Sequence, residues 1–394
     1  MRYAAPGVYV REVANGIRPL SPVGTSTAAF IGAAATDDRR DVAVAVNDWS
    51  QFVRLFASNA AEPADHLTLA VAGFFDNGGS RCYVVNTAAT DPLSGRAPRS
   101  ALRALDAIDD VSIIAAPGRS AIEDHAALVL YCESDHRRDC VAILDPPSAV
   151  DDVLRLAEVA TAATGSTTAT GLRPPSSEFA TLYFPWLVVA DPLTGQRVEA
   201  PPSGHVAGIW ARTDALRGVH KAPANEVVRG ALGLTYQVAR QEQELLNPAG
   251  VNCIRAFPRE GIKIWGARTL AEESSEFRYL NVRRLVTMLR ETIVAGTRWI
   301  VFEPNDERLW NSVVCNVSAF LTQVWRDGAL MGPTPGDAFF VKCDAETNPP
   351  EIRDAGQVVA VVGIAPVKPA EFVVFEIAQH HTESIGAGRG ADRG

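Results

Sequence analysis

Short apolar runs alternate with amphipathic segments between residues 25 and 225. The apolar runs are short and nearly continuous, as expected of strands buried on both faces: 28–32, 82–85, 111–114, 140–144 and 181–189. The segments between them have helical spacing: 49–56, 66–75, 101–108, 122–131 and 153–163. This alternation predicts an α/β domain with a largely parallel sheet.

The pattern changes in the second half of the chain. Apolar stripes of helical period run along residues 281–295 and along a longer helix that Asn305 or Asp306 can cap and that ends at Gly328. The intervening residues 299–302 are predicted to form a strand. Further β segments are expected at 339–343, 357–364 and 371–377, and the overall class is therefore α+β.

Both ends of the chain are β-prone and detached by prolines. Residues 8–13 lie among Pro6, Pro19 and Pro22, which disfavour a helix, and carry too little apolar surface to form a core alone. They are expected to pack on their own body or on a neighbour. Residues 380–394 are polar and glycine-rich and are predicted to form a flexible tail.

Composition and charge narrow the possible partners. The formal net charge is −9, and because phosphate binding needs a basic face, nucleic acid is not an expected partner. No apolar stretch reaches membrane-span length and the start has no signal-peptide pattern, so we expect synthesis in the cytoplasm and no membrane insertion. The six cysteines form no C-x-x-C pair and are expected to be buried hydrophobes.

Catalytic motifs are missing from the sequence. It contains no P-loop, no H-E-x-x-H and no G-x-S-x-G, and residues 386–390 and 380–381 lack the context of a phosphate or metal site. We therefore expect no enzyme activity, no cofactor and no metal. An α/β enzyme whose site assembles from distant residues stays open as an alternative, and it predicts a polar pocket within residues 25–225.

Several blocks in a fixed order carry a family resemblance. They are PGVYVREV from residue 6, PVGTSTAAFIG from 22, PSGHVAGIWARTD from 202, WIVFEPND from 299, FFVKCD from 339, Asn348-Pro349, and VGIAPVKPAEF from 362. The chain resembles the tail sheath proteins of contractile phages, R-type bacteriocins and extracellular contractile injection systems. Residues 33–200 match only in general character, and the chain is too short for large decorating domains.

The resemblance implies a division into parts. A C-terminal sheath core domain would carry donated N- and C-terminal β-arms and an inserted α/β domain. The expected parts are an N-terminal arm at 1–22, the α/β domain at 23–225, the core domain at 226–369, a C-terminal arm at 370–379 and the tail.

In this family each arm adds a strand to a sheet of a neighbouring subunit. The donated strands would contain Val8, Tyr9, Val10, Val13, Phe372, Val373, Val374 and Phe375. The acceptor strands would contain Phe339, Val341, Val359 and Val361, and residues 358–362 are apolar on both faces, as in a strand covered on both sides. The alternative is that both arms pair within their own subunit.

The implied function is structural. Copies would polymerise helically around an inner tube and contract from a metastable extended state, driving the tube through a target envelope without nucleotide hydrolysis. The implied partners are further copies, the inner tube protein, baseplate and terminal cap proteins, and a second sheath paralogue. Another tail component, such as a tube or baseplate protein, is the second alternative; phage, bacteriocin and injection system are not distinguished.

Charged residues on the two long helices are candidates for tube contact. The first helix offers Arg283, Arg284 and Arg290 away from its apolar stripe. The second offers Glu307, Arg308, Arg326 and Asp327 near its ends. Exposed ion pairs are weak and reversible, which suits a contact that must be released. The alternative is a merely solvated charged face.

Overall fold

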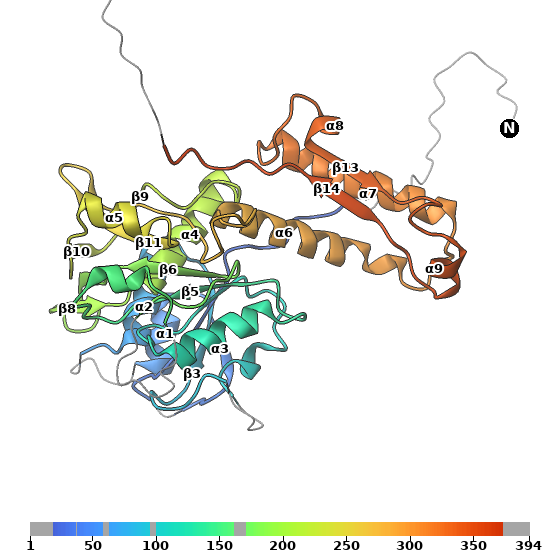
Figure 1. Ribbon diagram of the computed structural model, residues 1–394. Coiled ribbons are helices and arrows are strands. Elements are labelled where there is room, and N and C mark those ends of the chain that lie inside the picture. Colours follow the sequence, from blue (N-terminus) through green and yellow to red (C-terminus); the bar gives the residue numbers. More distant parts are fainter. Residues whose placement is uncertain (1–18, 37, 58–62, 95–99, 161–170, 373–394) are drawn as a thin grey trace, which may run out of the picture.

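A computed structural model shows an α/β body joined through one long helix to an outer unit of helices and a β-hairpin (Figure 1). The structure describes residues 19–36, 38–57, 63–94, 100–160 and 171–372. Within these residues no helix combines the length and the hydropathy needed to cross a membrane.

The body is built on a nine-stranded sheet with the order β2-β3-β1-β4-β5-β6-β11-β12-β9. Every pairing from β3 to β11 is parallel, and the outer strands β2, β12 and β9 pair antiparallel. The strands are β1 (Ala28–Gly32), β2 (Ala43–Val46), β3 (Cys82–Asn86), β4 (Ile113–Ala115), β5 (Val141–Leu144), β6 (Ala180–Phe184), β9 (Glu226–Val227), β11 (Val251–Phe257) and β12 (Gly261–Ile264). The expected α/β class with a largely parallel sheet is confirmed.

Helices cover both faces of this sheet, because alternate strand residues point to opposite sides. Phe30 belongs to one core, with side chains of α1 (Trp49–Phe56), α2 (His66–Asp76) and α4 (Ser203–Arg217). Its neighbour Ile31 belongs to the opposite core, with α3 (Ile122–Glu133), α5 (Arg240–Leu246) and the short 3-10 helices η1 (Arg103–Leu105) and η2 (Val153–Leu156). A small sheet, β10-β7-β8, lies beside them: β7 (Leu187–Ala190), β8 (Arg197–Ala200) and β10 (Ala231–Leu234).

The outer unit packs on one side of α6 (Leu280–Thr297). Its helix α7 (Glu307–Arg326) places Val313, Val317 and Phe320 against Leu285 and Leu289 of α6 in a third core. The unit is completed by η3 (Arg298–Ile300), α8 (Pro335–Ala338), β13 (Phe339–Lys342), α9 (Pro350–Asp354) and β14 (Val361–Ile364). Asp306 accepts hydrogen bonds from the first turn of α7, as expected of its N-cap.

Several sequence expectations need correction. Residues 299–302 form no strand; the chain makes η3 and a tight turn there, because it must reverse between α6 and α7. The helices expected at 101–108 and 153–163 are single 3-10 turns, η1 and η2, within the described residues. The run 181–189 is two strands, β6 and β7.

The expected domain division at residue 225 stays a prediction. Strands β9, β11 and β12 follow that residue, yet they continue the sheet of the body.

Among the cysteines, five are buried as expected, whereas Cys315 on α7 is exposed.

The contact between α2 and α4 depends on glycine, because the two helices approach closely. A Cβ atom at Gly208 would lie 2.4 Å from the carbonyl oxygen of Phe74, and one at Gly204 would lie 2.2 Å from that of Ala70. No side chain can be accommodated there without moving the helix backbones apart.

We expect Gly208→Ala to lower the free energy of unfolding by about 1–3 kcal/mol, because the methyl group must separate α2 from α4. Denaturant unfolding of the dispersed protein measures this change. Gly24→Ala is the matched control, since a Cβ atom at Gly24 meets no atom within 4 Å. Equal stability of the two variants would contradict the close helix contact.

Candidate functional site

The hairpin strands β13 and β14 form a separate two-stranded sheet. They pair antiparallel, with Phe339 opposite Ile364 and Lys342 opposite Val361. Each strand therefore has one strand partner in the described chain and one outer edge that pairs with no strand there. A two-stranded sheet is only marginally stable alone, and its free edges can accept further strands.

The two faces of the hairpin differ. Phe339 and Val341 pack against the core shared by α6 and α7. Phe340 is 56% exposed, and Val359 and Val361 are 37% and 44% exposed. The expected strand bounds 357–364 are wrong, because only β14 (Val361–Ile364) is strand. Its outer face is open in the described chain, and coverage on both sides stays a prediction.

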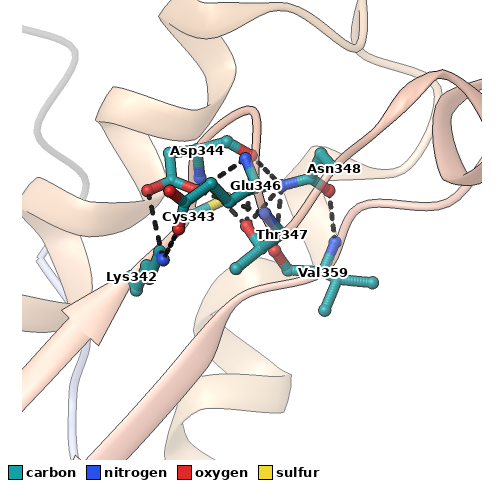
Figure 2. Close-up of polar contacts among 7 residues, drawn as sticks. All are labelled: Lys342, Cys343, Asp344, Glu346, Thr347, Asn348 and Val359. Carbon is teal, nitrogen blue, oxygen red and sulfur yellow. Dashed lines mark hydrogen bonds and ion pairs between the residues drawn. The ribbon is translucent and has the colours of Figure 1, made fainter.

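Asn348 fixes the chain that leads into β14 (Figure 2). Its side chain is buried, its Oδ1 accepts from the backbone N–H of Val359 at 2.7 Å, and its Nδ2 donates to the carbonyl of Val359 at 3.0 Å. Nδ2 also donates to the carbonyl of Asp344 at 3.1 Å and to Oγ1 of Thr347 at 2.9 Å. The amide thus replaces a neighbouring strand for Val359 and sets the direction in which β14 begins.

The N-terminal part of the described chain runs along the second half of α6. The backbone N–H of Val23 donates to Oγ1 of Thr292 at 3.1 Å, and the Leu20 side chain lies against Gly296. Leu20 is buried in the core of the outer unit. The described chain therefore begins at the C-terminal end of α6, and the predicted donor residues 8–13 lie outside the described residues.

The C-terminal part is anchored at the opposite end of α6. The side chain of Asn281 donates to the carbonyl of Val367 at 3.1 Å. The buried guanidinium of Arg268 forms a two-point ion pair with Glu371, with an Nε to Oε1 distance of 2.9 Å. Phe372 follows and is 77% exposed, while the predicted donor residues 373–375 lie outside the described residues.

α/β enzymes bind ligands at the carboxyl edge of the parallel sheet. In this chain Asp145 lies at that edge, and its carboxylate accepts hydrogen bonds from the chain itself. Asp145 accepts from the backbone N–H of Ser203 at 2.9 Å, from the Ser203 hydroxyl at 2.6 Å and from the N–H of Gly118 at 3.0 Å. Burial raises the pKa of Asp145 to about 6, against the effect of these hydrogen bonds. These contacts fix the start of α4.

A cavity of about 360 Å³ lies at the other edge, between α6 and the amino ends of β4 and β5. Its acidic lining residues are Asp109, Asp110, Asp139 and Glu291. No group of three or more His, Cys, Asp or Glu side chains suited to hold a metal occurs among the residues that the structure describes. The lining is mostly apolar despite these acidic groups, whereas the enzyme alternative expects a polar pocket, and the cavity lies away from the strand ends that serve catalysis in such sheets.

Comparison with known proteins agrees with the order of these parts. Residues 95–270 match the family model of the phage tail sheath protein central domain, and residues 272–380 match that of the phage tail sheath C-terminal domain. The chain belongs to the phage tail sheath family. The resemblance found in the sequence is confirmed.

Solved sheath structures share the fold over nearly the whole chain. The sheath complex of an extracellular contractile injection system, PVC, in its contracted state has 28% identity and a TM-score of 0.77, over 96% of this chain and 99% of that one. The contracted helical sheath of the anti-feeding prophage has 27% identity and a TM-score of 0.75, over 96% and 100%.

Sheath proteins of known phages and prophages are less similar to this chain in sequence, and they are longer than this chain. A tail sheath protein of Vibrio phage KVP40 is 24% identical over 63% of this chain and 38% of its own length. A putative prophage major tail sheath protein of Pseudomonas aeruginosa is 26% identical over 67% of this chain and 64% of its own length. The chain thus spans less than two thirds of the length of these curated relatives.

Two of the predicted tube-facing residues are buried in the sheath chain. Arg284 donates to both carboxylate oxygens of Asp214, at 3.0 and 2.5 Å, and Arg283 donates to Glu178 at 2.9 Å. The expectation that these side chains lie on an exposed face is wrong, because α6 is covered by the body on that side. The other candidates are exposed: Arg290, Glu307, Arg308, Arg326 and Asp327.

Sequence reasoning missed the roles of Asn348, Arg268 and Glu371. Asn348 belongs to one of the blocks that carry the family resemblance. The block marked the position, but it did not indicate that the side chain binds the backbone of Val359. No local pattern connects Arg268 with Glu371, because these residues are 103 positions apart.

We expect Asn348→Leu to destabilise the outer unit by about 1–3 kcal/mol, because the N–H and carbonyl of Val359 lose the partner that the buried Asn348 amide supplies. Faster hydrogen exchange of the Val359 amide and an earlier unfolding transition measure the effect. The control is Asn311→Leu, which changes an exposed position of α7. Unchanged exchange at Val359 would contradict the role of Asn348.

Proposed function

We propose that this chain is the structural subunit of a contractile sheath, which polymerises helically around an inner tube and acts without enzymatic chemistry. The observation that supports the proposal is that both outer edges of the hairpin β13–β14 pair with no strand in the described chain, combined with two β-prone chain ends. Two edges can accept two donated strands, one from each end of neighbouring copies.

The two ends start from well-separated points. Leu20 contacts the C-terminal end of α6, whereas Val367 contacts Asn281 at its N-terminal end. Since Asn281 and Gly296 are 15 positions apart on α6, these points are about 22 Å apart at 1.5 Å per residue. Ends that leave so far apart are suited to reach two different neighbours, and a contact that does not close on itself generates a helical polymer.

The donated strands would come from Val8, Tyr9, Val10 and Val13 at one end and from Phe372, Val373, Val374 and Phe375 at the other. The acceptors would be the edges formed by Phe339, Val341 and Val361, with Val359 just before β14. Strand addition satisfies the free backbone groups of both partners and covers the exposed Val361. Arms on tethers keep copies connected while the bodies move.

Contraction requires two packings of one lattice, of which the compact packing has the lower free energy. If shortening buries ~100 Å² more apolar surface per subunit, the gain is on the order of 2–3 kcal/mol for each copy at ~25 cal/mol per Å². Summed over a long polymer, this drives the movement without a nucleotide. Conformational energy stored during assembly would thus replace hydrolysis.

Helix α7 supplies the proposed tube-facing surface. Its solvent side carries polar and charged side chains, with Glu307 and Arg308 at one end and Arg326 and Asp327 at the other. Such exposed charges form weak contacts that can be released when the sheath shortens. Arg290 is exposed on α6 and is a secondary candidate.

The other partners follow from the same proposal. Baseplate and terminal cap proteins would bind the two ends of the polymer, and a second sheath paralogue would share the tube. The subunit would be made and assembled in the cytoplasm and then form part of a phage tail or a released tail-like particle. The residue limits of the arms and domains remain those expected from the sequence.

We expect the full chain expressed alone to form long hollow cylinders, and variants lacking residues 1–18 or 373–394 to form none. Both truncations keep the anchoring contacts of Leu20 and Glu371, so the folded body should be unchanged. Negative-stain electron microscopy and sedimentation measure the outcome, and thermal melting checks the fold. Cylinders from both truncated variants would refute the donated arms; small closed particles from the full chain would favour the enzyme alternative.

We expect the double variant Arg308→Glu/Arg326→Glu to reduce co-assembly with the tube protein on the order of tenfold, because weak charge contacts repeat along the lattice. Co-sedimentation of sheath and tube measures this, and added salt should weaken the parent complex as well. Arg240→Glu, at an exposed position of α5, is the control. Normal co-assembly of the double variant would exclude α7 as the tube-facing helix.

A further inference from the structure

The turn between α6 and α7 presents two apolar side chains to solvent. Val301 is 64% exposed and Phe302 is 102% exposed, so no described residue covers the ring. Phe302 also has a φ of 71°, in the left-handed region that residues with a large side chain rarely adopt. In the isolated subunit Phe302 therefore combines an exposed apolar ring with an unfavourable backbone conformation.

This turn is held in place on both sides. Asn305 accepts a hydrogen bond from Nε1 of Trp310 at 2.9 Å and donates to the carbonyl of Gln357 at 2.8 Å. Ile300, just before the exposed pair, packs against the small core of Leu309, Trp310 and Cys343. The turn is anchored immediately before and after Phe302, so the outward position of the ring is preorganised.

The exposed pair follows the C-terminal end of α6, where the described chain begins. Val23 contacts Thr292 and Leu20 contacts Gly296, so moving back along the chain means moving along α6 towards this turn. Leu20 and Ile300 belong to the same apolar core, so the described chain begins close to the residue that precedes the exposed pair. A neighbouring copy that accepts residues 1–18 is therefore the candidate to meet the turn.

We propose that Val301 and Phe302 form an apolar anchor that packs against a second copy of this chain, the copy that accepts residues 1–18. This inference rests on the proposed sheath function. Exposed aromatic side chains in fixed positions are typical energetic centres of protein interfaces, and charged neighbours such as Glu303 are typical of their rims. The tube is a poorer partner, because an apolar anchor resists the release that contraction requires there.

Substitutions at Phe302 distinguish the effect of the apolar ring from the effect of the backbone conformation. Phe302→Gly and Phe302→Asn both tolerate a φ of 71° and remove the apolar ring, so they should fold at least as well as the parent. Phe302→Leu keeps apolar bulk at the same position. Leu216→Ala, which shortens a 73% exposed side chain on α4, is the matched control.

The measurement is the lowest concentration at which the full chain, without tube protein, forms polymer in sedimentation. We expect this concentration to rise on the order of tenfold or more for Phe302→Gly and Phe302→Asn, because buried apolar area is lost at every contact. It should stay within about twofold for Phe302→Leu and Leu216→Ala. The melting temperature of the dispersed Gly variant should equal or exceed that of the parent.

Three outcomes overturn the proposal. Polymerisation of Phe302→Gly at the parent concentration excludes the contact between copies. Normal polymerisation combined with lost binding to the tube protein assigns the turn to the tube instead. A parent chain that stays dispersed at every concentration overturns the sheath function itself, which distinguishes that failure from a failure of the contact alone.

Discussion

The buried ion pair between Arg284 and Asp214 is the interaction on which the arrangement of the two parts depends. Arg284 lies on α6, donates to the carboxylate of Asp214 on α4 and to the carbonyl of Thr25, and stacks on the ring of Trp210 with its Cζ atom 4.7 Å from the ring centre. Both charged side chains are almost fully buried. Because a buried charge without its partner costs about 3–5 kcal/mol, α6 is fixed in one orientation on the body.

A fixed α6 determines where everything beyond it lies. It carries the third core on one side, and it sets the separation of the two points at which the chain ends leave. Arg283, held by Glu178 between the rings of Phe179 and Phe277, reinforces the same joint. The outer unit thus packs on α6 through the third core, and it carries the strand edges that have no strand partner in the described chain.

Buried polar groups inside the molecule differ from the exposed groups of the outer unit in whether they have partners within the described chain. Inside the molecule, polar groups such as those of Asp145 and Asn348 are paired with backbone partners. On the outer unit, by comparison, the outer edges of β13 and β14 pair with no strand among the described residues, and Phe302 and Phe340 are exposed. An outer unit with such an open periphery is suited to be completed by neighbouring copies.

The sequence by itself determined the parts that depend on local periodicity and on family pattern. The strands around Phe30, the helices α6 and α7 and the cap at Asp306 follow from spacing, because burial imposes a period of 2 or 3.6 residues. Only the tertiary structure decided which face of α6 is covered, so Arg283 and Arg284 proved buried although their spacing resembles a solvated face. It also decided that residues 299–302 turn and that Asn348 pairs with Val359. These outcomes depend on contacts between residues distant in the chain, and no local pattern encodes such contacts.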